Sequence, residues 1–178
     1  MKKKIFAITL LSTLMAPALA ENMYASLSLG SAFDNDLAGF SQTSTGMSYN
    51  LMFGYKVNKN FAAEIGYSSF LSDAGVANTV ATTETTNGFE TAGIGMLPFN
   101  NKLAVFGRLG YSNISAKYSL NGAVGKTEYL SGLVYGAGVQ FDINKQIGVR
   151  VGYNIYNTQG SRGDSIINNT YASALYNF

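Results

Sequence analysis

Several segments of the chain alternate between large apolar residues and small or polar ones. In the clearest of them Val149, Val151 and Tyr153 alternate with Arg150 and Gly152. A period of two places the large side chains on one face of an extended strand and the small ones on the other. The three best examples are residues 47–56, 103–112 and 147–155. The pattern therefore predicts β-strands with two faces of different character.

The face opposite the large residues consists mainly of Gly, Ser and Asn, and only 12% of the whole chain is charged. A soluble β-sandwich buries its bulky faces between two sheets and leaves the other faces charged and hydrated. A glycine-rich face with few charges is poorly suited to water. The inverse arrangement accounts for it: the bulky face meets lipid, and the small polar face lines a narrow lumen.

Polar segments of two lengths separate the alternating ones. Short turns are expected at residues 57–60, 97–102 and 142–146, and long loops at 34–45, 69–87, 113–126 and 157–169. The expected strands are residues 22–32, 46–56, 61–69, 86–96, 103–113, 128–141, 147–156 and 170–178. The fold class is thus all-β, a closed eight-stranded antiparallel transmembrane β-barrel. Short periplasmic turns, long extracellular loops and two periplasmic termini complete the expected topology.

The first 20 residues differ from the rest. Three lysines precede a mostly apolar stretch, and Ala18-Leu19-Ala20 has the small-x-small pattern of a signal-peptidase site. The apolar stretch is about half the roughly 20 residues that a spanning helix needs. We therefore expect a signal peptide at 1–20 and an outer-membrane β-barrel domain at 21–178. Removing the leader lysines leaves nine basic and ten acidic residues, so the precursor's pI gives no argument for nucleic-acid binding.

The composition excludes most catalytic and metal chemistry. The chain has no Cys and no His. Disulfides, thiolate zinc sites and histidine-dependent nucleophile pairs are therefore unavailable. Because the usual hydrolytic constellations of outer-membrane enzymes need histidine, we expect no enzyme, no catalytic residue, no metal and no cofactor.

Aromatic residues make up 13% of the chain and fall near the ends of the expected strands. Outer-membrane barrels carry aromatic girdles at both membrane interfaces. The expected periplasmic girdle is Tyr55, Phe61, Phe141, Tyr176 and Phe178. The expected aromatics of the upper half are Tyr49, Tyr67, Tyr111, Tyr129 and Tyr153.

Taken together and in order, several short motifs resemble the eight-stranded membrane domain of outer membrane protein A (OmpA). They are Gly54-Tyr55-Lys56-Val57-Asn58, Glu64-Ile65-Gly66-Tyr67, Arg108-Leu109-Gly110, Gly138-Val139-Gln140-Phe141, Val149-Arg150-Val151-Gly152-Tyr153 and Tyr176-Asn177-Phe178. The resemblance spans the expected mature chain except the loops. Because no C-terminal periplasmic domain is expected after Phe178, peptidoglycan binding is not carried over.

The resemblance implies a cluster of interior charges. Glu64, Arg108 and Arg150 all fall on the inward face given by the alternation, and Glu64 is expected to pair with one or both arginines. Where the family pattern has an acidic residue, this chain has Gln140. We therefore expect one carboxylate against two guanidinium groups and an excess positive charge in the lumen, so that any leak favours anions or is narrow.

Arg162, Gly163 and Asp164 form an RGD tripeptide in the fourth expected loop, where a host receptor of the integrin type would reach it. The alternative is a glycine-centred turn with two solubilising charges.

Three functions remain open. The first is a non-enzymatic barrel resembling the OmpA membrane domain, which supports envelope integrity and presents four surface loops. The second is a surface adhesin or host-interaction protein, and the third is a narrow porin-like channel for small solutes. Expected partners are outer-membrane lipid, both lipopolysaccharide and phospholipid, the barrel assembly machinery through Phe178, and in the second case a host receptor. No nucleic-acid partner is expected.

Overall fold

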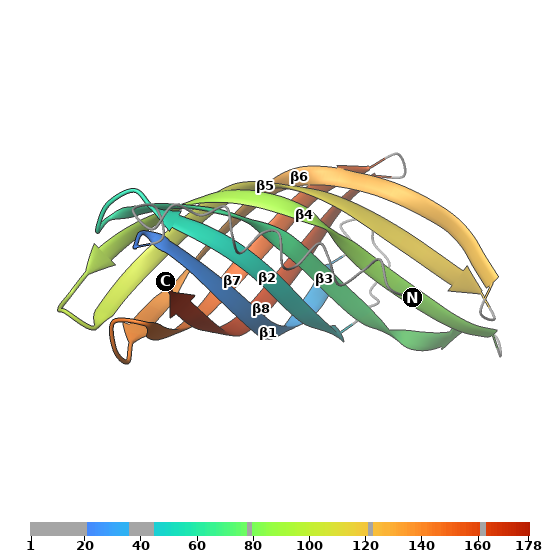
Figure 1. Cartoon of the computed structure of the whole chain (residues 1–178). Coiled ribbons are helices and arrows are strands. Elements are labelled where there is room, and N and C mark those ends of the chain that lie inside the picture. Colours follow the sequence, from blue (N-terminus) through green and yellow to red (C-terminus); the bar gives the residue numbers. More distant parts are fainter. Residues whose placement is uncertain (1–20, 36–44, 78–79, 121–122, 161–162) are drawn as a thin grey trace, which may run out of the picture.

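The computed structural model describes residues 21–35, 45–77, 80–120, 123–160 and 163–178. Its strands form one closed antiparallel barrel in chain order, and β8 returns to pair with β1 (Figure 1). The strands are β1 (Met23–Asn35), β2 (Thr45–Lys56), β3 (Phe61–Ala77), β4 (Val80–Pro98), β5 (Leu103–Leu120), β6 (Ala123–Asp142), β7 (Ile147–Gly160) and β8 (Gly163–Asn177). The expected eight-stranded fold is confirmed. In the described residues no helix has the length and apolar character to cross a membrane.

The two faces of each strand follow from the sequence alternation. Along β7 the side chains alternate between exposed and buried, with Val149 and Val151 outside and Arg150 and Gly152 inside. The same parity places Leu27, Leu51, Ile65 and other large residues on the outer surface. Since closure pairs every strand on both sides, this outer apolar surface suits a lipid environment.

Three turns and the C-terminus lie together at one end of the barrel, at the left in Figure 1. The turns join β2 to β3, β4 to β5 and β6 to β7, as expected. At the same end the Phe178 amide donates to the Met23 carbonyl oxygen, 3.0 Å away, which ties the C-terminus to the start of β1. We call this the turn end.

Most of the polar stretches expected as long loops are strand instead. β3 continues to Ala77 and β4 begins at Val80, so the expected loop at 69–87 is mainly paired backbone. The expected loops at 113–126 and 157–169 are likewise largely strand. The prediction of their length was wrong because polar side chains on both faces remove the alternation without breaking the ladder of backbone hydrogen bonds.

The lumen holds two clusters of buried apolar side chains. The first lies toward the turn end and contains Tyr24, Ala62, Ile94, Met96, Phe106, Tyr171 and Leu175. The second lies toward the opposite end and contains Ala32, Phe70, Ile114, Val134, Tyr156 and Ile167. Eight strands enclose a space that side chains can fill. The barrel therefore has a packed interior, with the charged residues set among the first cluster.

Candidate functional site: the charged cluster of the lumen

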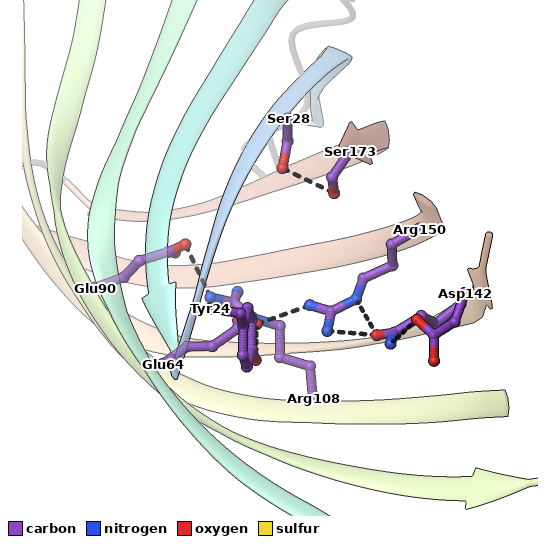
Figure 2. Close-up of polar contacts among 9 residues, drawn as sticks. Tyr24, Ser28, Glu64, Glu90, Arg108, Asp142, Arg150 and Ser173 are labelled. Atoms are coloured by element: carbon purple, nitrogen blue, oxygen red, sulfur yellow. Dashed lines mark hydrogen bonds and ion pairs between the residues drawn. The ribbon is translucent and has the colours of Figure 1, made fainter. Parts of the chain in front are cut away.

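Glu64 lies at the centre of the charged side chains in the lumen (Figure 2). Its Oε1 accepts a hydrogen bond from Arg150 Nη1 at 2.7 Å and another from the Tyr24 hydroxyl at 2.6 Å. Its Oε2 accepts a longer one from Arg108 Nε at 3.4 Å. Because the Glu64 side chain is only 2% exposed, water contributes little to its stabilisation, and these donors replace it.

A second carboxylate, Glu90 of β4, completes the cluster. Arg108 Nη2 donates to Glu90 Oε1 at 2.9 Å, and both side chains are buried. The expectation of one carboxylate against two guanidinium groups is therefore wrong. Two carboxylates face Arg108 and Arg150, the four charges balance, and the argument for an anion-selective leak loses its basis.

Over residues 93–96 of β4 the small residues point outward and the large ones inward, which is why Glu90 was missed. Its large residues Ile94 and Met96 point inward, whereas Gly93 and Gly95 point outward. A rule that places bulky side chains on the lipid face assigns this strand the wrong parity. Phe89 indicates the correct parity, because its ring faces outward and the next residue in a strand, Glu90, must then face inward.

Gln140 connects the cluster to a further acidic side chain. Its Oε1 accepts from Arg150 Nη2 at 2.9 Å and from Arg150 Nε at 3.3 Å, while its Nε2 donates to Asp142 Oδ1 at 2.9 Å. The neutral amide thus satisfies the side of the Arg150 guanidinium that Glu64 does not reach. The structure brings together all four residues expected in the lumen and adds Tyr24, Glu90 and Asp142.

Aromatic rings enclose the Arg150 guanidinium. Its Cζ lies 4.7 Å from the centre of the Phe106 ring and 5.8 Å from that of Tyr24. Two glycines provide the space for these rings. A side chain at Gly54 would collide with the Tyr24 ring, and a Cβ at Gly138 would lie 2.6 Å from Phe106 Cζ. The inward glycines therefore permit aromatic packing in a narrow lumen.

The cluster joins strands from all round the barrel. Its members come from β1, β3, β4, β5, β6 and β7, so the hydrogen bonds run across the lumen rather than along one wall (Figure 2). Two buried polar pairs lie apart from the cluster: Ser28 Oγ donates to Ser173 Oγ on the neighbouring strand at 3.1 Å, and Ser48 Oγ donates to Asn169 Oδ1 at 2.7 Å. A connected and buried polar network of this kind rigidifies the structure that satisfies it.

A small cavity adjoins the cluster. It is lined by Glu64, Glu90, Arg108 and Arg150 together with Ser, Asn, Met and Tyr side chains. It offers about 10 Å³ to the centre of a water molecule, close to the minimum that a single buried water needs. Beside the four charged groups there is room for about one water.

The five girdle aromatics lie on the outer surface near the turn end. Tyr55 and Phe61 flank the turn between β2 and β3, Phe141 precedes the turn between β6 and β7, and the others end the chain. The Tyr176 and Phe178 rings pack edge to face, with their centres 5.4 Å apart.

The RGD tripeptide lies at the opposite end of the sequence pattern, and two of its residues are described. Gly163 and Asp164 begin β8, where Asp164 is exposed and pairs with Gln159. Arg162 lies outside the described residues.

Among the described residues no group of three or more His, Cys, Asp or Glu side chains has the arrangement to hold a metal ion.

Solved structures with the same fold are small outer-membrane barrels. Neisserial surface protein A aligns with a TM-score of 0.73 and 14% identity, covering 88% of this chain and 97% of that one. The attachment invasion locus protein Ail of Yersinia pestis was solved with the heparin analogue sucrose octasulfate. It aligns with a TM-score of 0.60 and 19% identity, covering 88% of this chain and 99% of that one. The N-terminal β-barrel domain of OprF from Pseudomonas aeruginosa aligns with a TM-score of 0.51 and 10% identity, covering 85% of this chain and 97% of that one.

No curated protein sequence matches the chain significantly. The family model of the outer membrane protein beta-barrel domain matches residues 6–178. This match covers nearly all of the chain and agrees with the closed barrel, the lipid-suited surface and the polar lumen. The chain therefore belongs to the outer membrane protein beta-barrel domain family.

Proposed function

We propose that this outer-membrane barrel is a non-enzymatic scaffold that supports envelope integrity and presents the end opposite the turns to the cell exterior. The observation that carries the proposal is the balanced network of two carboxylates and two guanidinium groups across the lumen. With Tyr24 and Gln140 the network joins six strands, and such cross-links resist deformation of the barrel wall. Such rigidity serves a mechanical role in the membrane.

Deletion and complementation test this role. A strain lacking the gene is expected to become more sensitive to detergent and to large antibiotics, and the wild-type gene restores resistance. Single variants Glu64→Gln and Arg150→Met, expressed at equal levels in the membrane, are expected to restore it less completely. Full resistance in the deletion strain would contradict the envelope role without affecting the fold.

The orientation belongs to the same proposal, with the turn end in the periplasm. The chain has no cysteine, so single cysteines introduced at exposed sites can be labelled without background. In intact cells an impermeant maleimide is expected to label Thr127→Cys, which lies near the far end of β6, and to leave Asn101→Cys in a turn unlabelled. The reverse pattern would overturn the orientation.

The export signal is tested by the N-terminus of the mature protein. Cleavage after Ala20 is expected to leave Glu21 as the first residue. Edman sequencing or intact mass of protein from outer membranes gives the answer directly, and an N-terminus at Met1 would contradict it.

A surface-recognition role is the second candidate, because part of the barrel wall projects beyond the rest. β3 to β6 contain 17 to 20 residues, whereas β1 and β2 contain 13 and 12. In the described residues β2 pairs with β3 only as far as Ser72, and β7 pairs with β6 only from Leu130 onward. At the right in Figure 1 the four longer strands extend as a curved sheet. An extended sheet of this kind offers a broad surface to a partner.

The charges at that end differ from those that suit a sulfated polymer. The sequence places six acidic residues at or beyond the ends of the expected strands opposite the turns, and only three basic ones. The acidic residues are Asp34, Asp36, Asp73, Glu84, Glu128 and Asp164, and the basic ones are Lys117, Lys126 and Arg162. Binding of a heparin analogue, as in the Ail structure, is therefore not carried over to this chain. A basic protein surface is the partner favoured by charge.

Whole-cell adhesion measurements separate recognition from scaffolding. Replacing residues 113–126 by another β-hairpin segment of equal length is expected to reduce binding to host cells if the projecting sheet is used. Asp164→Glu tests the RGD tripeptide separately, because an integrin-type receptor is expected to reject the longer side chain. Unchanged adhesion in both variants would remove this second function.

A channel function is not proposed. The charged side chains, their aromatic neighbours and the second apolar cluster all occupy the lumen, and the space beside the charges suits about one water molecule.

A further inference from the structure

The three turns of the turn end have the same structure. In each, an apolar residue is followed by Asn, two polar residues and a second apolar residue, as in Val57-Asn58-Lys59-Asn60-Phe61. The Asn58 side-chain oxygen accepts hydrogen bonds from the amides of Asn60 and Phe61 at 2.8 and 2.9 Å. Asn100 and Asn144 bond in the same way to the amides two and three residues later, at 2.7 to 2.8 Å. These Asx turns fix all three connections in one conformation.

Each turn carries one exposed lysine and an exposed apolar residue. The lysines are Lys59, Lys102 and Lys145, and the apolar residues are Val57, Phe99 and Ile143. Phe99 lies in the turn between β4 and β5 and is 71% exposed. Residues 57–60, 99–102 and 143–146 contain no acidic residue. Asp142 precedes the third turn, but it accepts a hydrogen bond from Gln140 Nε2, and no ion pair between the described residues involves any of the three lysines. We call these three lysines the turn-end lysine ring.

The ring lies next to the aromatic girdle, at the level where a spanning barrel leaves the hydrocarbon. An apolar side chain at this level favours the region between acyl chains and headgroups. Lysine extends its ammonium group from there to the headgroup phosphates while its stem stays against apolar surface. The combination in each turn therefore suits a charged lipid surface better than open water.

We propose that the turn-end lysine ring binds the headgroups of anionic phospholipids and enriches them around this end of the barrel. The assignment to the periplasmic leaflet rests on the proposed orientation, whereas the lipid preference itself does not. One other lysine of the described residues lies near this end and is less available. Lys56 donates to Asn177 Oδ1 at 2.7 Å inside the barrel mouth.

Quenching by brominated lipid measures the preference directly. The chain has no Trp, so a single Phe141→Trp reporter in the girdle gives an unambiguous signal from this end. The protein is reconstituted in phosphatidylcholine vesicles containing brominated phosphatidylglycerol or brominated phosphatidylcholine. Each lysine near an anionic surface raises the affinity for that surface on the order of fivefold. We therefore expect phosphatidylglycerol to be preferred over phosphatidylcholine around this end by about threefold or more. A Tyr111→Trp reporter, which lies farther from the turns in the middle of β5, is expected to show a smaller preference.

Charge removal identifies the residues responsible. The triple variant Lys59→Gln, Lys102→Gln and Lys145→Gln is expected to lose the preference at the Phe141→Trp reporter. The matched control, Lys117→Gln, Lys126→Gln and Arg162→Gln, removes the same charge from the opposite end and is expected to retain it. Each single Lys→Gln variant is expected to show a partial loss, which keeps the test available if the triple variant folds poorly.

Two results would overturn the proposal. One is equal quenching by the two brominated lipids in the wild-type background, and the other is an unaltered preference in the triple variant. If instead the control variant loses the preference to the same degree, net charge rather than the ring is responsible, and the proposal also fails. None of these results bears on the envelope role, which the deletion strain tests independently.

Discussion

Arg150 Nη1 lies 2.7 Å from Glu64 Oε1, although the two residues are 86 positions apart in the chain. Arg150 belongs to β7 and Glu64 to β3, and these strands are not neighbours in the barrel. The pair therefore connects strands on different sides of the lumen that share no backbone pairing. With the Tyr24 hydroxyl on the same carboxylate oxygen and Gln140 on the other side of the guanidinium, it links β1, β3, β6 and β7.

Breaking this pair from one side is expected to be costly. Arg150→Met leaves the Glu64 carboxylate buried without its shortest charged donor, and such losses typically amount to about 3–5 kcal/mol. The free energy of unfolding, measured by urea titration in bilayers, gives the value. In a double-mutant cycle with Glu64→Gln, the double variant is expected to lose less free energy of unfolding than the two single variants lose together. Additive losses would show that the two side chains are not coupled.

Glu64 and Glu90 are expected to differ in importance. Glu64 accepts hydrogen bonds from Tyr24, Arg108 and Arg150, whereas Glu90 accepts one from Arg108. Hydrogen bonds to charged groups contribute roughly 1.5–3 kcal/mol each. Glu64→Gln is therefore expected to reduce the free energy of unfolding more than Glu90→Gln does. An equal or inverted order in the same titration would contradict the central position of Glu64.

The inward glycines provide a second test of the lumen. A Val side chain at Gly54 meets the Tyr24 ring, so Gly54→Val is expected to displace that ring and weaken its hydrogen bond to Glu64. Overpacking of this kind costs about 1–3 kcal/mol. Gly95→Val is the matched control, because a Cβ there meets nothing within 4 Å. The two unfolding free energies are compared in the same bilayer, and similar values would argue against a packed lumen at Gly54.

Assembly of the barrel is expected to depend on its C-terminal aromatic residue. We propose that Phe178 is recognised by the barrel assembly machinery, and Phe178→Ala is expected to slow the appearance of folded protein in the outer membrane. Folded protein is distinguished from unfolded by its altered migration before boiling on a denaturing gel. Phe99→Ala removes another exposed ring, located in a turn, and serves as the control. Equal assembly rates for the two variants would exclude a special role of Phe178.

The sequence predicted the strand number, the turn end and the inward residues of β7, because lipid outside and a narrow lumen inside impose a strict alternation on Val149, Arg150 and Val151. It failed where that contrast disappears. In β4 the inward Ile94 and Met96 fill the lumen and the outward glycines face lipid, so the position of Glu90 was hidden.

Two further features depend on relationships that no single strand reveals. The length of β3 to β6 depends on backbone pairing between polar segments, which hydropathy does not report. The bond from Tyr24 to Glu64 depends on the space at Gly54, a residue of a third strand.

The central claim is that the charged cluster and its aromatic neighbours close the lumen, and conductance of the purified folded protein in planar bilayers tests it most directly. We expect wild-type protein to produce no steady current, because the four paired charges leave room for about one water molecule. A heat-shift gel on the same sample establishes that the protein is folded. A stable ohmic current from folded wild-type protein, lost when the protein is unfolded, would contradict the claim.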